Sequence, residues 1–243
     1  MTSPHVDYET SAGDYAERRS LTEGRLSVWA GEVGPYVEHV DIAVDLGAGT
    51  GGFSSALHDW GASRVIAVEP SSAMEAEATR TDGVDHVRAR AESIPLRSHS
   101  SQLVWISTAF HHFEEPTAAA RECHRVLVGA GYVVIRGFVP GHSELEWLHL
   151  FPGSLKAVAR FPSFEEINRL FSLQGFRLVR DGLVMEGTQT YEARAEYSAR
   201  MRHADSILTA MSEAEVAAGI AALRSRGQEI EHFALSCLIY QRD

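Results

Sequence analysis

The chain has 243 residues, of which 44% are apolar, and its 22 Lys and Arg against 33 Asp and Glu give a formal net charge of -11. A chain of this length buries a substantial core, and its negative balance disfavours nucleic acid as a partner because a polyanion would be repelled. Two cysteines are too few for a thiolate zinc site, and no long apolar run or leader pattern occurs, so we expect a cytoplasmic protein without a membrane partner.

The predicted elements alternate between helix and strand over the first 138 residues. Residues 1–40 carry a polar, helical pattern that precedes the first strand signal, the apolar stretch at 40–46. Such an alternation predicts a parallel sheet. The later elements of this part are a helix at 53–60, a strand at 64–69, a helix from Ser72 with Glu75 as its capping partner, strands at 86–91 and 103–108, a helix at 117–127 and a strand at 132–138.

The pattern changes after Phe138. Residues 140–161 mix Gly, Pro, His and aromatic residues without a sustained period, and we expect them to form an inserted cover over the edge of the sheet. The remaining elements are a helix from Ser163 with a capping box to Glu166, a strand at 176–184, helical patterns at 190–209 and 212–225, and a last strand at 233–240.

The stretch DLGAGTGGFS, which begins at Asp45, directly follows the first strand. Its glycines allow a sharp turn and let a ligand rest against main chain, while the next helix offers free N–H groups to a negative end. Gly47, Gly49 and Gly52 also fit the dinucleotide pattern GxGxxG, which by itself is a weak signal. Asp45 would repel a pyrophosphate and attract an ammonium group, and Glu69 can accept hydrogen bonds from ribose hydroxyls. S-adenosylmethionine carries both groups.

Four motifs in order resemble those of the class I S-adenosylmethionine-dependent methyltransferases, in the small-molecule branch with a methyltransferase type 11 domain. They are DLGAGTG, VIAVEPSSAM, RARAESIPL, and the pair SSQLVWISTAFHHF and ECHRVLVGAGYVVI. The resemblance implies an α/β fold with a Rossmann-like doubly wound sheet of about seven strands, the last one antiparallel. The resemblance also implies a single domain, 1–243, with an insertion after the fifth strand. Its parts are an N-terminal helical cover at 1–40, a cofactor-binding core at 41–138, and a substrate-side cover with the C-terminal strands at 139–243.

The resemblance also implies a set of cofactor-binding residues. Asp45 and the glycines would hold the methionine moiety, Glu69 would take the ribose hydroxyls, and Met74 would lie against adenine. Arg90 stands where the family commonly has an acid for the adenine amino group, and a guanidinium cannot accept that hydrogen bond. The set implied by the resemblance is Tyr15, Arg19, Asp45, Gly47, Ala48, Gly49, Gly51, Glu69, Pro70, Met74, Ala91, Glu92 and Ser107.

The N-terminal stretch YETSAGDYAERRSLT resembles the segment that folds over the cofactor in this branch. Tyr15 and Arg19 have the spacing of a pair that approaches the cofactor carboxylate, which the planar guanidinium of arginine suits. A helix with a solvated arginine pair is the alternative for Arg19. Met74 has an alternative too, because methionine on a helix often fills gaps in a core.

Histidines and aromatic residues are the candidates for the acceptor side. His111 and His112 follow the fourth predicted strand, whose end faces the cofactor site, and imidazole can accept a proton near neutral pH. His111 is the candidate general base and His112 a candidate substrate contact, with packed histidines as the alternative. His142, Glu146 and Trp147 are candidates for a substrate wall or for a solvated helix face. The histidine pairs lack the spacing of a metal site, so no metal is expected.

The residues and the resemblance together predict transfer of a methyl group from S-adenosylmethionine to a small-molecule acceptor, with secondary metabolism as a family-level expectation. An NAD-dependent oxidoreductase is one alternative, supported by the GxGxxG spacing and Glu69. A protein that binds S-adenosylmethionine without transferring methyl is another, because each strong motif reports cofactor binding and none reports transfer. The oligomeric state and the acceptor are not predicted.

Overall fold

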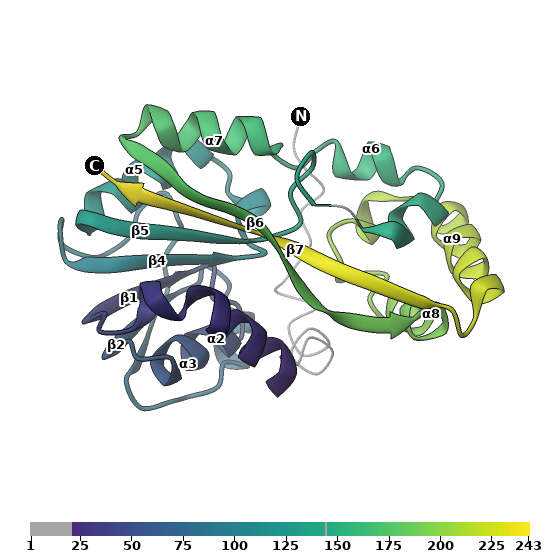
Figure 1. Cartoon of the computed structure of the whole chain (residues 1–243), viewed down its shortest axis with the longest axis horizontal. Coiled ribbons are helices and arrows are strands. Elements are labelled where there is room, and N and C mark those ends of the chain that lie inside the picture. Colours follow the sequence, from purple (N-terminus) through teal and green to yellow (C-terminus); the bar gives the residue numbers. More distant parts are fainter. Residues whose placement is uncertain (1–20, 144) are drawn as a thin grey trace.

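A seven-stranded sheet in the order β3-β2-β1-β4-β5-β7-β6 forms the centre of the computed structural model, which describes residues 21–143 and 145–243 (Figure 1). β7 runs antiparallel to both of its neighbours, whereas β1, β2, β3, β4 and β5 pair in parallel. The predicted α/β sheet with an antiparallel last strand is therefore confirmed. The strands are β1 (Ile42–Leu46), β2 (Arg64–Val68), β3 (Val84–Val87), β4 (Ser101–Ser107), β5 (Leu127–Gly137), β6 (Phe176–Thr190) and β7 (Ile230–Arg242).

Helices cover both faces of the sheet, as a doubly wound fold requires. On one face Trp29 of α2 packs edge-on against Trp105 of β4, with their ring centroids 5.9 Å apart. On the other face Phe171 of α7 stacks on Tyr240 of β7 at 4.7 Å. The central strands are apolar on both faces because both are buried. The helices around the sheet are α2 (Glu23–Val37), α3 (Gly52–Asp59), α4 (Ser72–Ala76), α5 (Pro116–Val126) and α7 (Phe164–Leu173), with the 3-10 turn η1 (Phe110–His112).

A third hydrophobic core lies beyond the sheet, around the far ends of β6 and β7 (Figure 1). Tyr191, Met201 and Phe233 are buried in it together with Trp147. We call the segments that build it, residues 145–161 and 191–229, the lobe. Its helices are η2 (Glu146–Leu150), α6 (Ser154–Val158), α8 (Tyr191–Arg200), η3 (Leu208–Ala210) and α9 (Glu213–Arg226).

The capping box predicted at Ser163 is confirmed, a second box forms at Ser212, and the one predicted at Ser72 is wrong. Ser163 and Ser212 each exchange hydrogen bonds with the glutamate three residues later, at the starts of α7 and α9. The cap of α4 is Ser71, whose side chain accepts from the backbone N–H of Met74, and not Ser72. Adjacent serines offer the same side chain, so only the backbone conformation decides which one caps.

Other element boundaries also differ from the sequence prediction. The third strand ends at Val87 instead of 91, and the helix expected over 190–209 ends at Arg200. After that helix, Asp205 accepts from the backbone N–H groups of Ile207 and Leu208 and starts a short 3-10 turn instead. Residues 140–161, expected to be irregular, contain η2 and α6.

No helix within residues 21–143 and 145–243 combines the length and the apolar character needed to cross a membrane.

Gly219 lets α9 pack closely on the loop after η2. A Cβ at this position would lie 2.3 Å from Cδ1 of Phe151, a buried ring. Gly219→Ala should therefore force the ring to move, and overpacking of this kind costs about 1–3 kcal/mol. We predict that urea unfolding will give Gly219→Ala a free energy of unfolding about 2 kcal/mol below that of the matched variant Gly31→Ala. Gly31 lies in α2, where an added Cβ meets nothing within 4 Å. Equal stabilities of the two variants would contradict the packing described.

Candidate active site

The glycine loop joins β1 to α3 in a conformation that favours glycine. Gly47, Gly49 and Gly51 have φ angles of 77°, 56° and 80°, all in the left-handed region. A Cβ on Gly47 would also lie 2.5 Å from Cβ of Ala109, which follows β4. Gly51 is the N-cap of α3 and has no side chain to cap it, so the positive end of the helix dipole faces the loop. The predicted role of these glycines in a close backbone turn is consistent with this geometry.

Asp45, near the end of β1, is 1% exposed. The hydroxyl of Ser54 donates a hydrogen bond to its carboxylate at 2.6 Å. Burial raises the pKa of Asp45 to about 7, although the Ser54 hydrogen bond works in the opposite direction, and the charge of Glu69 adds to the increase. Both the protonated and the ionised form of this carboxyl group are therefore populated near pH 7, and a nearby ammonium group would favour the ionised form.

Glu69, directly after β2, ties two loops together. One of its oxygens accepts from the backbone N–H of Gly49 at 2.8 Å, and the other accepts from that of Ser71 at 2.9 Å. A carboxylate has about four acceptor sites, so these two bonds are compatible with further donors such as sugar hydroxyls. The carboxylate therefore also fixes the glycine loop against the second strand.

The predicted adenine end is held by contacts within the chain. Arg90 forms ion pairs with Glu92, at 3.6 Å, and with Glu114. Glu92 also accepts from the backbone N–H groups of Glu114 and Glu115, directly before α5. Among the other predicted residues here, Met74 and Ala91 are buried, whereas Pro70 is exposed and its carbonyl accepts from Arg88.

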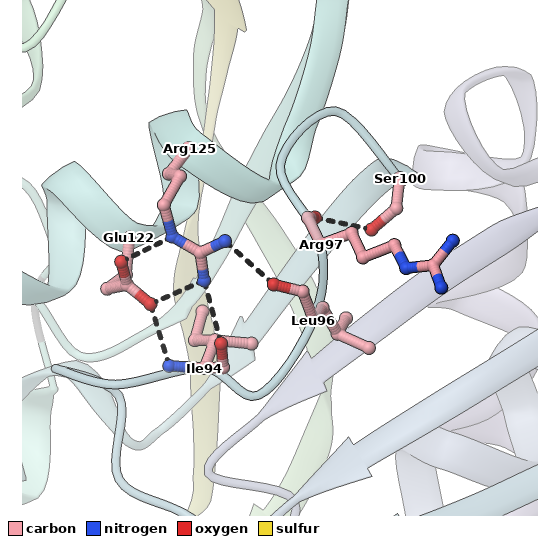
Figure 2. A network of polar contacts seen from close by, with 6 residues as sticks. All are labelled: Ile94, Leu96, Arg97, Ser100, Glu122 and Arg125. Carbon is pink, nitrogen blue, oxygen red and sulfur yellow. Dashed lines mark hydrogen bonds and ion pairs between the residues drawn. The ribbon is translucent and has the colours of Figure 1, made fainter.

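The segment that follows Glu92 is clamped to α5 by an acid and an arginine (Figure 2). Arg125 donates to the carbonyl oxygens of Ile94 and Leu96, each at 2.7 Å, and pairs with the carboxylate of Glu122. Glu122 in turn accepts from the backbone N–H of Ile94 at 2.8 Å. This network lowers the pKa of Glu122, chiefly through the Arg125 hydrogen bonds, so both groups are charged at neutral pH.

A cavity of about 680 Å³ connects the glycine loop to the lobe. Of the predicted cofactor residues, Asp45, Gly47, Ala48, Gly49 and Ser107 line it. The opposite wall is made by the lobe and the adjoining strands, and its polar and aromatic members include Trp147, Gln189, Arg194, Tyr197, Asp205 and Phe233. The remaining predicted residues in the described part of the chain are outside this lining: Gly51, Glu69, Pro70, Met74, Ala91, Glu92, His112, His142 and Glu146. Tyr15 and Arg19 lie outside the described residues.

His111 lines the cavity and bridges the sheet to the lobe. Its Nε2 shares a hydrogen bond of 3.0 Å with the hydroxyl of Ser206, and its ring stacks on Phe161 at 4.2 Å. The ring of His112 lies 3.9 Å from that of His111, on the side of the 3-10 turn η1. His111 therefore lines the cavity, and its contact with an acceptor stays a prediction.

Two predicted substrate residues are tied to other elements. Nδ1 of His142 shares a hydrogen bond of 2.8 Å with Ser236 on β7. The hydroxyl of Tyr191 donates to Glu146 at 2.8 Å, and burial, followed by this bond, raises the pKa of Tyr191 to about 12. Trp147, the third, lines the cavity and lies buried in the lobe.

A buried ion pair that sequence reasoning missed lies beside the cavity. Arg136 on β5 pairs with Glu186 on β6, and also donates to the hydroxyl of Ser107 at 3.0 Å. The indole N–H of Trp29 donates to the same carboxylate at 2.7 Å. A bulge of β6 leaves Glu186 without a partner in the ladder, and a bulge can turn a side chain toward the interior. The one signal in the sequence was a lone arginine within the apolar run VVIRGF.

The end of β4 turns sharply beside this ion pair. Thr108 has a φ of 52°, which is strained for a β-branched residue, and its backbone N–H donates to the carbonyl of Arg136 at 2.7 Å. Strain of this kind collects at functional sites, where the surrounding structure holds it in place. The turn brings Ala109 against Gly47, so the ends of β1 and β4 meet at the cavity.

Within the described residues, no three His, Cys, Asp or Glu side chains gather in a way that would hold a metal ion.

Comparisons with known proteins agree with this geometry. Residues 44–135 match the model of a family described as a methyltransferase domain. A candidate methyltransferase of Dictyostelium discoideum is 35% identical over 98 residues, which make up 40% of this chain and 36% of that protein. The match thus spans little more than a third of the length of this curated relative.

Solved structures share the fold at low sequence identity. A candidate methyltransferase from an antibiotic biosynthesis pathway of Anabaena variabilis superposes with a TM-score of 0.70 and 21% identity, over 91% of this chain and all of that one. The phosphoethanolamine N-methyltransferase 2 of Haemonchus contortus, solved with phosphomonomethylethanolamine and S-adenosylhomocysteine, gives a TM-score of 0.63 and 16% identity over 96% of this chain and 57% of that one. At these identities the likeness shows the fold.

The raised pKa of Asp45 predicts a stability change that depends on pH. Because the folded chain holds the Asp45 proton to about pH 7 and the unfolded chain releases it near 3.8, the folded state loses stability as pH rises through that interval. Asp45→Asn keeps the shape without the charge, so its melting temperature should exceed that of the wild type at pH 8 and approach it at pH 5. Thermal scans at the two pH values test this, and an equal difference at both would contradict the assigned pKa.

The clamp on the segment after Glu92 predicts a local effect. Arg125→Met removes charge-assisted hydrogen bonds to the carbonyl oxygens of Ile94 and Leu96, and each such bond contributes about 1.5–3 kcal/mol. Amide hydrogen exchange of Ile94 and its neighbours should therefore become much faster. Arg121→Met is the matched control, because Arg121 lies on the exposed side of the same helix. Similar exchange in both variants would show that the clamp does not hold the segment.

Proposed function

Because the chain contains a methyltransferase domain at residues 44–135, we propose that it is an S-adenosylmethionine-dependent methyltransferase with a small-molecule acceptor. The observation that carries the proposal is the cavity of about 680 Å³ that runs from the glycine loop to the lobe. Its size is typical of small-molecule sites, and its lining combines aromatic and aliphatic side chains with polar and charged ones. The net charge of -11 further disfavours a nucleic-acid acceptor.

Asp45 and Glu69 are the residues that would select the cofactor. A buried carboxyl with a pKa of about 7 suits the ammonium group of the methionine moiety, and Glu69 at the end of the next strand suits the ribose hydroxyls. The open space where Gly49 lacks a Cβ lets the loop approach a ligand closely. Met74 and Ala91 are proposed for the adenine side, where Arg90 is already paired with acids.

The chain itself contributes position and enclosure. S-adenosylmethionine, when bound, supplies an electrophilic methyl group on a positively charged sulfur. The lobe and the ends of β4 and β5 would orient an acceptor beside the glycine loop and exclude water, and good alignment lowers a barrier by about 7–11 kcal/mol. No nucleophilic residue is needed for a direct displacement.

His111 would serve as the proton acceptor if the acceptor group is a hydroxyl. Its Nε2 shares a hydrogen bond with Ser206, which orients the ring at the cavity wall. A neutral amine could attack without a base, so this role depends on the acceptor. We also propose a cytoplasmic location and an acceptor from secondary metabolism, as the sequence composition and the resemblance imply.

Cofactor binding gives a direct test. Calorimetric titration with S-adenosylhomocysteine should show a single site in the wild type. Asp45→Asn should lose most of the affinity because it removes the charge, and Gly49→Val because its side chain fills the space beside the glycine loop. Asp41→Asn, at an exposed residue directly before β1, is the matched control and should bind as the wild type does. Binding of NADH in place of S-adenosylhomocysteine would contradict the proposal and favour an oxidoreductase.

The affinity for S-adenosylhomocysteine should also depend on pH. An ammonium group binds the ionised form of Asp45, and the ionised fraction grows as pH rises through about 7. The dissociation constant should therefore fall by about tenfold between pH 6 and pH 8, and binding should release a proton in this interval. Calorimetry in buffers of different ionisation enthalpy measures both quantities. A dissociation constant that does not change with pH would show that Asp45 does not bind the ammonium group.

A further inference from the structure

We propose that the acceptor is a flat, largely apolar molecule that carries a carboxylate, and that Arg194 is the specificity-determining residue that binds this carboxylate. This inference rests on the proposed function, since it places the acceptor in the cavity beside the cofactor residues. Arg194 lies on α8 in the lobe wall, opposite the glycine loop. No motif in the sequence marks it.

Arg194 is held in place from behind by a buried acid. Its Nε donates to Glu231 at 3.1 Å, and the same carboxylate oxygen accepts from the side chain of Gln189 at 2.9 Å. The side chain of Glu231 is 0% exposed and that of Arg194 is 11% exposed. A buried carboxylate of this kind orients an arginine firmly because neither charge is stable alone.

Only one of the three guanidinium nitrogens of Arg194 donates a hydrogen bond to Glu231. A guanidinium can bind both oxygens of a carboxylate, but here Nε alone contacts Glu231, whose second oxygen is buried and has no hydrogen-bond partner among residues 21–143 and 145–243. Within the same part of the chain, no group accepts a hydrogen bond from the two terminal nitrogens of Arg194, which lines the cavity. A planar pair of donors at a cavity wall fits a carboxylate of a ligand.

Aromatic rings surround this guanidinium. Its central carbon lies 5.1 Å from the ring of Trp147, 5.2 Å from that of Tyr197 and 5.9 Å from that of Phe233. Trp147, Tyr197 and Phe233 also line the cavity, so aromatic residues adjoin the donors there. A flat apolar body with a carboxylate at its end matches such a wall.

Matched pairs of carboxylates and amides test the inference. The protein saturated with S-adenosylhomocysteine is titrated calorimetrically with benzoate, cinnamate and indole-3-acetate, and with the primary amide of each acid. We expect at least one carboxylate to bind about tenfold or more tightly than its amide. The double variant Arg194→Gln with Glu231→Gln, which leaves no buried charge unpaired, should lose this preference and keep its affinity for S-adenosylhomocysteine.

Arg224→Gln is the matched control, because Arg224 is an exposed arginine of the lobe that pairs with Glu192. It should retain the preference of the wild type. Carboxylates that bind no better than their amides in the wild type, including a panel in which nothing binds, would overturn the inference, and so would a preference that survives in the double variant. If S-adenosylhomocysteine itself fails to bind, the proposed function falls, and titration of the same pairs without it still decides whether Arg194 binds carboxylates.

Discussion

The buried carboxylate of Glu186 is the constraint around which the cavity is built. A charge that is 7% exposed is stable only with partners, and Glu186 takes them from separate parts of the chain. Trp29 and Arg25 come from α2, while Arg136 comes from the fifth strand. One acid therefore fixes α2 against the sheet at the wall of the cavity. Arg136 is held further by the rings of Trp29 and Phe53, at 5.2 Å and 4.9 Å.

The parallel sheet and the glycine loop could be read from the sequence because they rest on local patterns. Apolar runs gave the strands, and glycines with an acid at the end of the first strand gave the loop, whose backbone angles need those residues. The bulge that directs Glu186 inward could not be read, since it depends on pairing with a strand that begins more than forty residues later. The choice between Ser71 and Ser72 as a helix cap could not be read either, because it depends on the backbone conformation at the two serines.

The acceptor side of the cavity was the part least visible in the sequence. His111 and Trp147 were found as candidates and do line the cavity, whereas Arg194 lies on an ordinary helical pattern and was missed. Its importance appears only when α8 meets the buried acid at the start of β7 and the ring of Trp147. His142 and Glu146, chosen for their place in the chain, lie outside this lining and form hydrogen bonds with other elements. Side chains drawn from segments far apart in the chain make a wall that no spacing rule describes.

The lobe has a hydrophobic core of its own, separate from the two cores on the faces of the sheet. Substitutions that reshape the wall around Arg194 therefore act mainly on packing within the lobe and on its contacts with the start of β7. Such a division would let the wall of the lobe change while the glycine loop keeps its geometry. Diversity among proteins with this architecture should accordingly concentrate in the lobe, and uniformity at the ends of the parallel strands.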